Sequence, residues 1–318
     1  AYRKQRRGGV GVTAMETREE DFVEHLFVAS THEPLLFFTT AGRCHWLKVH
    51  EVPQASRYAK GMAIVNLLSL QKEERLSTFV AVKAFEPGRF LIMATKQGTI
   101  KKTTLDAYAN PRKAGIIAIT LEQGDALIEA KITDGEREVL LVTKQGKAIR
   151  FPETQARGVG RSARGVRGIR LGKGDEVIAM VMAQPKAELL TVTTLGFGKR
   201  SPIEAYRLQS RGGKGIINIK VTKKNGEVIG AKVVADDSEL MLISHEGMMV
   251  RCAVKDIRST GRAAQGVRLI NIKGKDRVAS VAAVVPREKE DVNGAKKSES
   301  AKAADVPAPE LAEAAPAQ

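Results

Sequence analysis

The chain has 318 residues, 43% of them hydrophobic, and a formal net charge of +16. That length and apolar content suffice for a large folded core. The sequence has no run of about eighteen apolar residues, which a membrane span would need, and no charged segment followed by an apolar one, which would mark export. We therefore expect a cytoplasmic protein whose partner is a polyanion, either nucleic acid or an anionic membrane surface.

A glycine-rich basic motif recurs along the chain with a period of about fifty residues. The last glycines of its six copies, at intervals of 50, 54, 50, 50 and 51 residues, are Gly11, Gly61, Gly115, Gly165, Gly215 and Gly266. Four positions earlier stand Arg7, Arg57, Arg161, Arg211 and Arg262, and Arg112 of the third copy is displaced by one. A second series follows in the first five copies: Gly42, Gly98, Gly146, Gly196 and Gly247. Because the two glycine series recur with the same period, they predict an array of repeats.

Each repeat has the pattern of short β-strands. In the fourth repeat, apolar runs at 176–183 and 189–195 are separated by Gly, Asp and Lys residues, and no segment keeps a helical period over about twelve residues. Gly196 and its equivalents stand between two such runs, where a tight hairpin needs a positive φ. Alternation of apolar and polar residues over 217–221 predicts a half-buried strand. We expect about four antiparallel strands per repeat.

The predicted fold class is all-β. A four-stranded unit of about fifty residues cannot bury its faces alone, so the repeats must stack, either radially as a propeller-like disc or as an open solenoid. We predict the radial arrangement, with six blades, for residues 1–285. Residues 286–318, rich in Ala, Pro and charged side chains, are expected to form a disordered tail. Because the chain starts at Ala1 inside a patterned segment, we expect it to be part of a longer polypeptide.

The first copy of the motif carries a family resemblance. The heptad Gln5-Arg6-Arg7-Gly8-Gly9-Val10-Gly11 resembles the Q-R-R-G-G-K-G box in the C-terminal domain of bacterial DNA gyrase A subunits, and 165–171 resembles that family's fourth repeat. The resemblance covers roughly residues 1–285. It implies a six-bladed β-pinwheel that exchanges strands between blades and wraps duplex DNA around its rim. Val10 departs from the lysine of the box, whereas the heptad at 209–215 departs from it only at Ser210.

Two rows of residues are candidates for binding DNA. Arginine can make bidentate bonds to a phosphate, and glycine lets backbone N–H groups approach an anion. The first row, in the glycine turns, consists of the box residues Gln5, Arg6, Arg7, Gly8, Gly9 and Gly11, with Arg57, Lys60, Arg161, Arg164, Arg211, Lys214 and Arg262. The second row, after the hairpin glycines, consists of Lys101, Lys102, Arg150, Lys199, Arg200 and Arg251. The structural alternatives are a hydrogen bond across blades for the first row, and a solvated charge or a guard of a strand edge for the second.

No catalytic residues are predicted. The five histidines lack metal-ligand spacing with cysteines or acids, so no metal or cofactor is expected in this domain. Cys44 and Cys252 lie far apart and are expected to be reduced and buried. By the resemblance, the DNA-cleaving tyrosine belongs to another domain of the family's polypeptide, so this fragment by itself is not expected to be an enzyme. Single-stranded DNA is usually bound by stacking its bases on aromatic side chains. Because aromatic residues make up only 4% of the chain, duplex DNA is favoured over single-stranded DNA.

The resemblance implies a non-catalytic domain of a type II, ATP-hydrolysing DNA topoisomerase associated with the nucleoid. Its partners would be double-stranded DNA, bound largely without regard to sequence, and, in the full protein, a gyrase A dimer with gyrase B subunits. Bending DNA around a basic rim would let the whole enzyme introduce negative supercoils by strand passage. Two alternatives stay open: the C-terminal domain of topoisomerase IV, which Val10 favours, and a propeller scaffold for protein partners.

Overall fold

The computed structural model describes residues 12–13, 30–31, 33–54, 62–71, 74–110, 112 and 114–284. Contacts divide the chain into two units, Ala1–Val285 and Pro286–Gln318, and all described residues belong to the first. The predicted tail lies outside the described residues, as do eight candidate DNA-binding residues: Gln5, Arg6, Arg7, Gly8, Gly9, Gly11, Arg57 and Lys60. Within the described ranges, no helix is long and apolar enough to cross a bilayer.

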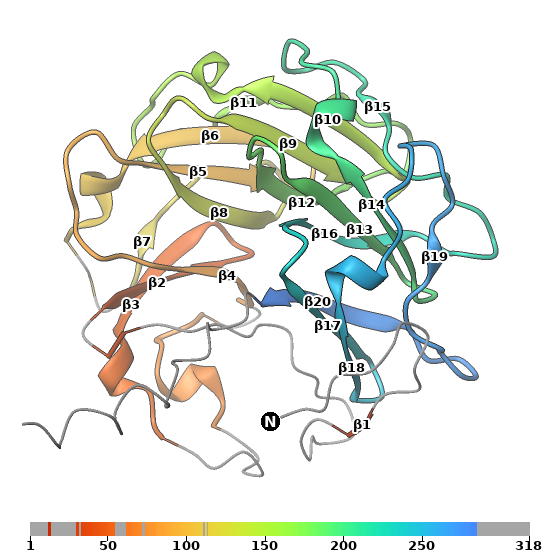
Figure 1. The fold of residues 1–318 in the computed structure, drawn as a ribbon. Helices are drawn as coiled ribbons and strands as arrows, with labels where there is room; N and C mark the ends of the chain where they lie inside the picture. The colour runs from red at the N-terminus through yellow and green to blue at the C-terminus, as the bar shows by residue number, and fades with distance from the viewer. Residues whose placement is uncertain are drawn as a thin grey trace, which may run out of the picture. The chain divides into compact units, whose positions relative to one another are not determined.

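The described residues form five four-stranded sheets, labelled in Figure 1. The first consists, from edge to edge, of β4 (Leu76–Ala81), β2 (Pro34–Thr39), β3 (Arg43–Lys48) and β7 (Ile116–Ile117). The second consists of β8 (Leu127–Thr133), β5 (Phe90–Thr95), β6 (Thr99–Thr104) and β11 (Val166–Arg167). The third consists of β12 (Val177–Met182), β9 (Glu138–Thr143), β10 (Lys147–Pro152) and β15 (Ile216–Ile217).

The last two sheets follow the same order. The fourth consists of β16 (Val228–Val234), β13 (Glu188–Thr193), β14 (Phe197–Pro202) and β19 (Val267–Arg268), and the fifth of β20 (Val278–Val284), β17 (Glu239–Ser244), β18 (Met248–Ala253) and β1 (Val12–Thr13). Short 3-10 helices are η1 (Val49–Glu51), η2 (Ile64–Asn66), η3 (Leu105–Tyr108), η4 (Glu153–Gln155), η5 (Ile203–Ala205) and η6 (Val254–Asp256). The all-β repeat prediction is confirmed. The expected six blades are not found: the described part of the chain contains five, and much of the first repeat lies outside it.

Every sheet is completed by a strand from outside its own hairpin. β7 follows β6 in the chain, yet it pairs with β3 of the previous hairpin, placing Ile116 opposite Cys44. β11, β15 and β19 return in the same way to β6, β10 and β14, and β1 pairs with β18 of the last hairpin. Each later repeat therefore supplies the outer strand of the sheet before it. A single repeat cannot complete its own hydrogen-bond ladder.

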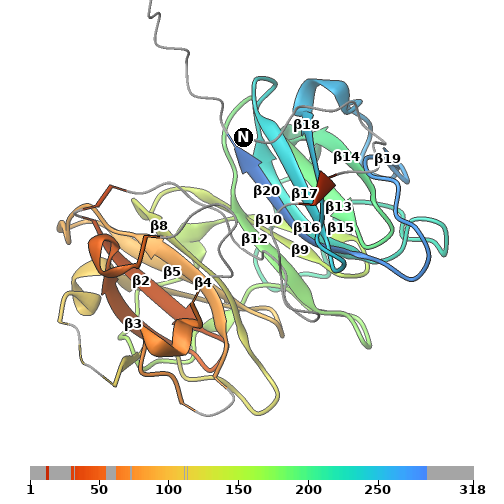
Figure 2. The same cartoon turned by 90° about the horizontal axis from the view of Figure 1, so that it is seen from below.

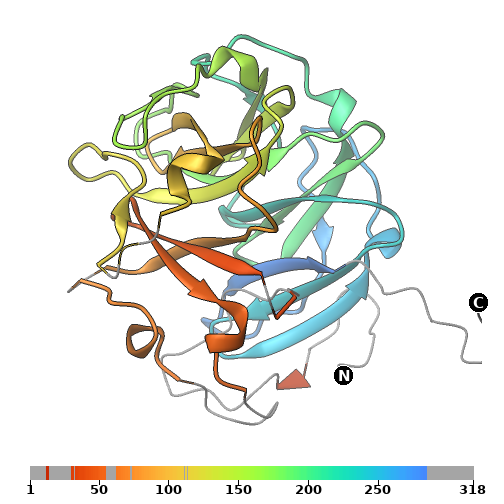
Figure 3. The ribbon, with the colours of Figure 1, turned by 90° about the vertical axis from the view of Figure 1, so that its left-hand side faces the viewer.

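The apolar core lies between successive sheets. Their inner strands contact one another in the order β4, β8, β12, β16 and β20, and Figure 2 gives a second view of the last three. Leu36 in the first sheet belongs to one buried cluster with Leu91 in the second. Ile92, whose side chain points to the other face of that strand, joins Leu141 of the third sheet. Figure 3 views the first hairpin, coloured red to orange, from the side. Each sheet is thus stabilised by the next.

The hairpin turns confirm the predicted role of the second glycine series. All five have a φ in the left-handed region, between 76° and 84°: Gly42, Gly98, Gly146, Gly196 and Gly247. Several of them are also crowded, because a Cβ on Gly146 would lie 2.4 Å from the carbonyl oxygen of Ile219. Turn geometry and close approach of the next repeat therefore both require glycine here.

The predicted strand over 217–221 is largely wrong. Only Ile216–Ile217 forms a strand, β15. The backbone N–H groups of Asn218 and Ile219 both donate to the carbonyl of Gly146, at 2.8 and 3.1 Å, and carry the chain across the hairpin tip. Asn218 is completely buried, so the alternation did not separate an inner from an outer face of a sheet. Contacts with another repeat override the local strand pattern.

Gly215→Ala should destabilise the fold, whereas Gly172→Ala should not. Gly215 has a φ of 69°, and a Cβ there would lie 2.6 Å from the carbonyl oxygen of Ala148. A Cβ on Gly172 would meet nothing within 4 Å. We expect losses of about 2–4 kcal/mol and less than about 0.5 kcal/mol, respectively, in the free energy of unfolding. Urea unfolding followed by circular dichroism measures both, and equal stabilities would contradict the close contact.

Candidate nucleic-acid interface

Three lysines of the predicted hairpin row are buried. Lys101, Lys102 and Lys199 are only 1%, 7% and 1% exposed. The Lys102 ammonium donates to the backbone carbonyls of Gly135 and Glu153 in the following repeat, at 3.3 and 3.2 Å. Because these side chains are buried and already bonded, we no longer count them among the residues that could touch a phosphate directly. The hairpin period did not distinguish a lysine at the surface from one inside.

Lys101 and Lys199 support two glycine turns from below. The Lys101 ammonium donates to the carbonyl of Ala118 at 2.5 Å and also to that of Arg161. The Lys199 ammonium donates to the carbonyl of Gly261 at 3.3 Å. Arg161 and Gly261 belong to the turns that end at the fourth and sixth motif glycines, about sixty residues from the lysines in sequence. A buried cation in one repeat thus holds the backbone of a later one.

Burial changes the acid–base behaviour of these two lysines. Burial, followed by the nearby positive charge of Arg161, lowers the pKa of Lys101 to about 7. The same two causes, with Arg262 as the neighbouring charge, lower the pKa of Lys199 to about 8. Both ammonium groups are therefore close to losing a proton at physiological pH.

The arginines of the hairpin row join neighbouring repeats. Arg150 bonds Glu138, with Nε 2.6 Å from Oε2, and donates to the carbonyl of Tyr206 in the next repeat at 3.1 Å. Arg200 makes the equivalent bond, 2.5 Å long, from Nε to the carbonyl of Ile257. Each guanidinium therefore connects its hairpin to the 3-10 turn of the following repeat, and its charge is already shared with a carboxylate.

Trp46 stands four positions after Gly42, where the later hairpins carry Lys102, Arg150, Arg200 and Arg251, and it has a similar role. Its indole N–H donates to the carbonyl of Tyr108 at 3.0 Å, at the 3-10 turn of the next repeat. Arg251, in the last hairpin, bonds Glu239 through Nε at 2.6 Å. The property shared by Trp46, Arg150 and Arg200 is therefore an N–H donor that reaches the next repeat, and positive charge is secondary.

The periodic arginines of the glycine turns also bond across repeats. Each donates through Nη1 to the carbonyl of the second residue of the preceding short strand: Arg161 to Ile117 (2.7 Å), Arg211 to Arg167 (3.0 Å) and Arg262 to Ile217 (2.9 Å). Among the described residues, Arg161 and Arg262 donate through this nitrogen alone, so other N–H groups of the planar fork are left for a ligand. A structural bond across blades and a phosphate contact are compatible in these side chains.

The cations most accessible to a polyanion lie on and beside the turns. Arg164 and Lys214, both predicted, are exposed, and the Arg164 guanidinium lies 4.0 Å from Glu122, an equally exposed carboxylate. Further exposed arginines were not predicted. Arg157, Arg207 and Arg258 stand eight positions before successive motif glycines, and Arg167 and Arg268 stand two positions after the fourth and the sixth. Alignment of the copies over a longer window would have found the first three.

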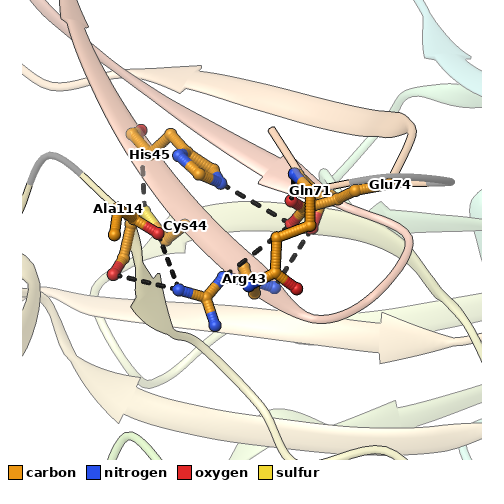
Figure 4. A network of polar contacts seen from close by, with 8 residues as sticks. Arg43, Cys44, His45, Gln71, Glu74 and Ala114 are labelled. Carbon is orange, nitrogen blue, oxygen red and sulfur yellow. Dashed lines mark hydrogen bonds and ion pairs between the residues drawn. The ribbon is translucent and has the colours of Figure 1, made fainter. Parts of the chain in front are cut away.

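A buried polar cluster lies under the turn that ends at Gly115, and Figure 4 shows it from close by. His45 and Glu74 are buried, with Nε2 and Oε1 3.6 Å apart. Arg43 donates from Nη2 to the carbonyl of Ala114 at 2.6 Å. Imidazole, carboxylate and guanidinium here hold the turn in place, as Lys101 and Lys199 do in other repeats.

In the part of the chain that the structure describes, no group of three histidine, cysteine or acidic side chains could hold a metal ion. Cys44 and Cys252 are both buried and neither forms a disulfide, as predicted. Burial raises the pKa of the Cys44 thiol, so it stays protonated and unreactive.

Lys101 and Lys199 predict that the free energy of unfolding rises with pH. Their folded pKa values lie below the value of about 10.4 in an unfolded chain, so between about pH 7 and 10 the unfolded state binds more protons. A rise in pH then favours the folded state. From pH 7.5 to 9 we expect a gain of about 1 kcal/mol for each lysine. In urea unfolding, the Lys199→Met variant should show a smaller gain in the free energy of unfolding over this pH range. The Lys147→Met variant, changed at an exposed position, should show the full gain.

The sequence matches the family model of the DNA gyrase C-terminal domain, a β-propeller, over residues 1–30, 33–83, 89–134, 137–184, 187–235 and 238–284. Curated relatives include the DNA gyrase A protein of Halalkalibacterium halodurans, 54% identical over 283 residues, and that of Clostridium acetobutylicum, 47% identical over 283 residues. Both alignments cover 89% of this chain and 34% of the relative. The chain therefore spans about a third of the length of these relatives.

Solved structures agree with this assignment. The C-terminal domain of DNA topoisomerase IV superposes with a TM-score of 0.73 at 27% identity, covering 80% of each chain. A DNA gyrase A C-terminal domain superposes with a TM-score of 0.75 at 24% identity, covering 89% of this chain and 92% of the other, and supports the fold. Periodic four-stranded blades, basic glycine turns and these matches lead to one conclusion: the chain belongs to the DNA gyrase C-terminal domain family of β-propellers.

Proposed function

We propose that this chain is the DNA-wrapping domain of a DNA gyrase A protein, and that duplex DNA binds along the sheet edges formed by the short strands and glycine turns. The observation that carries the proposal is the register of exposed cations. Arg157, Arg207 and Arg258 occupy one position in successive repeats, beside the turns that carry Arg164 and Lys214. A duplex presents phosphates in a regular row without a sequence requirement, which a periodic basic edge fits.

The energy of bending requires contacts from most repeats. Elastic bending of about 35 base pairs through about 180° costs roughly 12 kcal/mol. Charge-assisted bonds contribute about 1.5–3 kcal/mol each, so two or three anchors cannot offset that cost, whereas six to twelve can. The described turn residues in the proposed contact set are Arg161, Arg164, Arg211, Lys214 and Arg262. Gln5, Arg6, Arg7, Gly8, Gly9, Gly11, Arg57 and Lys60 belong to the same proposal, outside the described residues.

We also infer that the complete domain is a six-bladed pinwheel. A short strand that follows one hairpin pairs with the hairpin before it, as β7 pairs with β3. β1 precedes the first described hairpin and pairs with β18 of the fifth, while β14 of the fourth hairpin is already paired with β19. In a closed ring of five, the hairpin before β1 would be the fifth, so the same rule would pair β1 with β14 of the fourth hairpin. Its pairing with β18 fits a ring with one further blade between the fifth sheet and the first.

In the whole enzyme, we propose that the wrapped segment is presented to the other domains for ATP-dependent strand passage, which introduces negative supercoils. The corresponding partners are gyrase B subunits and a second copy of gyrase A. The C-terminal domain of topoisomerase IV is a second candidate identity, because the solved domain of that enzyme has a similar fold and Val10 departs from the gyrase box. DNA binding without a stable wrap would favour it.

Wrapping should change DNA topology. When nicked plasmid is closed by ligase in the presence of the 318-residue chain, we expect the linking number to shift in proportion to the bound protein, because a wrapped path constrains writhe. Topoisomers separated on an agarose gel after protein removal give the measurement. An unchanged distribution at saturating protein would rule out wrapping by this chain.

Neutralising Arg164 and Lys214 together, as Arg164→Gln and Lys214→Gln, should weaken duplex binding without destabilising the fold, because both side chains are exposed. Loss of two phosphate contacts predicts roughly tenfold weaker binding and a log–log salt slope smaller by about 2. Lys232→Gln is the matched control, since β16 lies at the opposite edge of its sheet from β19. Fluorescence anisotropy at several salt concentrations measures these values. A flat salt response of the unmodified chain would support a protein scaffold instead.

A further inference from the structure

In four of the described hairpins, one position lies beneath a glycine turn. It is the residue before the N–H donor that reaches the next repeat, and we call it the base position: His45, Lys101, Ile149 and Lys199. A Cβ on Gly115 would lie 2.6 Å from the His45 ring, and one on Gly213 would lie 3.5 Å from Ile149. Lys101 and Lys199 bond the backbone of their turns directly. The base position therefore differs between turns in charge.

Of the histidine and the two lysines at the base position, only the histidine lies beside a carboxylate in the described part of the chain. His45 faces the carboxylate of Glu74. Among the described residues, no carboxylate forms an ion pair with Lys101 or Lys199. Their bonds go to carbonyl oxygens and, for Lys199, to the hydroxyl of Ser201 at 2.6 Å. A buried charge without a counterion is unfavourable, and a nearby anion would stabilise it.

The charged side chains that shift the pKa values of the two lysines are both positive. Arg161 is the charged neighbour of Lys101, and Arg262 that of Lys199. Neutral titratable groups share partners with the lysines: Tyr108, next to Cys44, bonds the Ala118 carbonyl as Lys101 does, and Tyr206 interacts with Ser201 as Lys199 does. Burial raises the pKa of each of these hydroxyl and thiol groups, so they stay neutral across the physiological range. Each of the two turns therefore has two basic side chains: a buried lysine beneath it and an arginine on it.

We propose that a DNA phosphate held at each of the turns 161–165 and 262–266 is the counterion of the buried lysine beneath it, Lys101 or Lys199. These lysines are then positioning residues for two DNA anchors: they hold the turn backbone that carries the arginine, and they add charge from below. The turn at 209–215, over Ile149, has two adjacent glycines and binds without such a cation. This inference rests on the proposed DNA binding.

The proposal has a consequence that a purely structural lysine would not have. A phosphate nearby favours the charged ammonium, so DNA binding should raise the pKa of both lysines and take up protons from solution. Duplex affinity should then fall as pH rises from 7 to 8.5, which is opposite to the pH dependence of stability without DNA. Phosphodiester groups do not titrate in this range, and the comparison between variants cancels the contribution of the terminal amino group.

The test is isothermal titration of the 318-residue chain with a duplex of about 40 base pairs, at constant ionic strength, in buffers of different protonation enthalpy. We expect uptake of about one proton in total per chain and roughly tenfold weaker binding at pH 8.5 than at pH 7. Lys101→Met with Lys199→Met should abolish the uptake, leave less than about twofold pH dependence, and weaken binding at pH 7 roughly three- to tenfold. Ile149→Met, the matched change at the base position of another turn, should behave as the unmodified chain.

Two results would overturn the proposal. One is DNA binding by the unmodified chain without proton uptake, and the other is unchanged uptake in the folded double variant. If the double variant does not fold, each single variant should lose about half of the uptake, and full uptake in both would count against the proposal. Absence of any duplex binding by the unmodified chain would instead contradict the proposed function.

Discussion

The exchange of short strands between repeats is the constraint on which the rest of the structure depends. A hairpin exposes unpaired N–H and C=O groups at its outer edge, and a two-residue strand from the next repeat covers them. The glycine turn directly precedes that strand, so each turn is placed against the sheet of another repeat. Gly266 fits there only because it lacks a side chain: a Cβ would lie 2.7 Å from the carbonyl oxygen of Gly198. Fold and interface therefore depend on the same contact.

Positive charge in this domain serves two purposes that the sequence does not separate. Arg150 and Arg200 bond a neighbouring repeat and a carboxylate, and Trp46 replaces the first of these functions without any charge. Arg164 and Lys214 are exposed, and the one carboxylate beside Arg164, that of Glu122, is exposed as well. A polyanion would meet the second group directly. The first group instead connects one repeat to the next, and the position of each repeat sets the spacing of the exposed cations.

The buried lysines connect these two purposes. Lys101 and Lys199 are enclosed like core residues, yet their ammonium groups bond turns whose outer surface carries exposed or half-exposed arginines. Ile149 shows that an aliphatic side chain can occupy the same position when the turn above it contains two adjacent glycines. Cations at this position therefore bear on the electrostatics of the turn as well as on packing.

Local pattern determined the fold class and the turns. The fifty-residue period, the positive φ at Gly196 and its equivalents, and the buried state of Cys44 follow from spacing and side-chain chemistry that act within one repeat. The tertiary structure decided the rest: that the strand predicted over 217–221 ends at Ile217, and that Lys101 is inside while Lys214 is outside. The turn that covers Lys101 lies about sixty residues away. Burial by a strand and turn from another repeat leaves no mark in the local sequence around the residue that is covered.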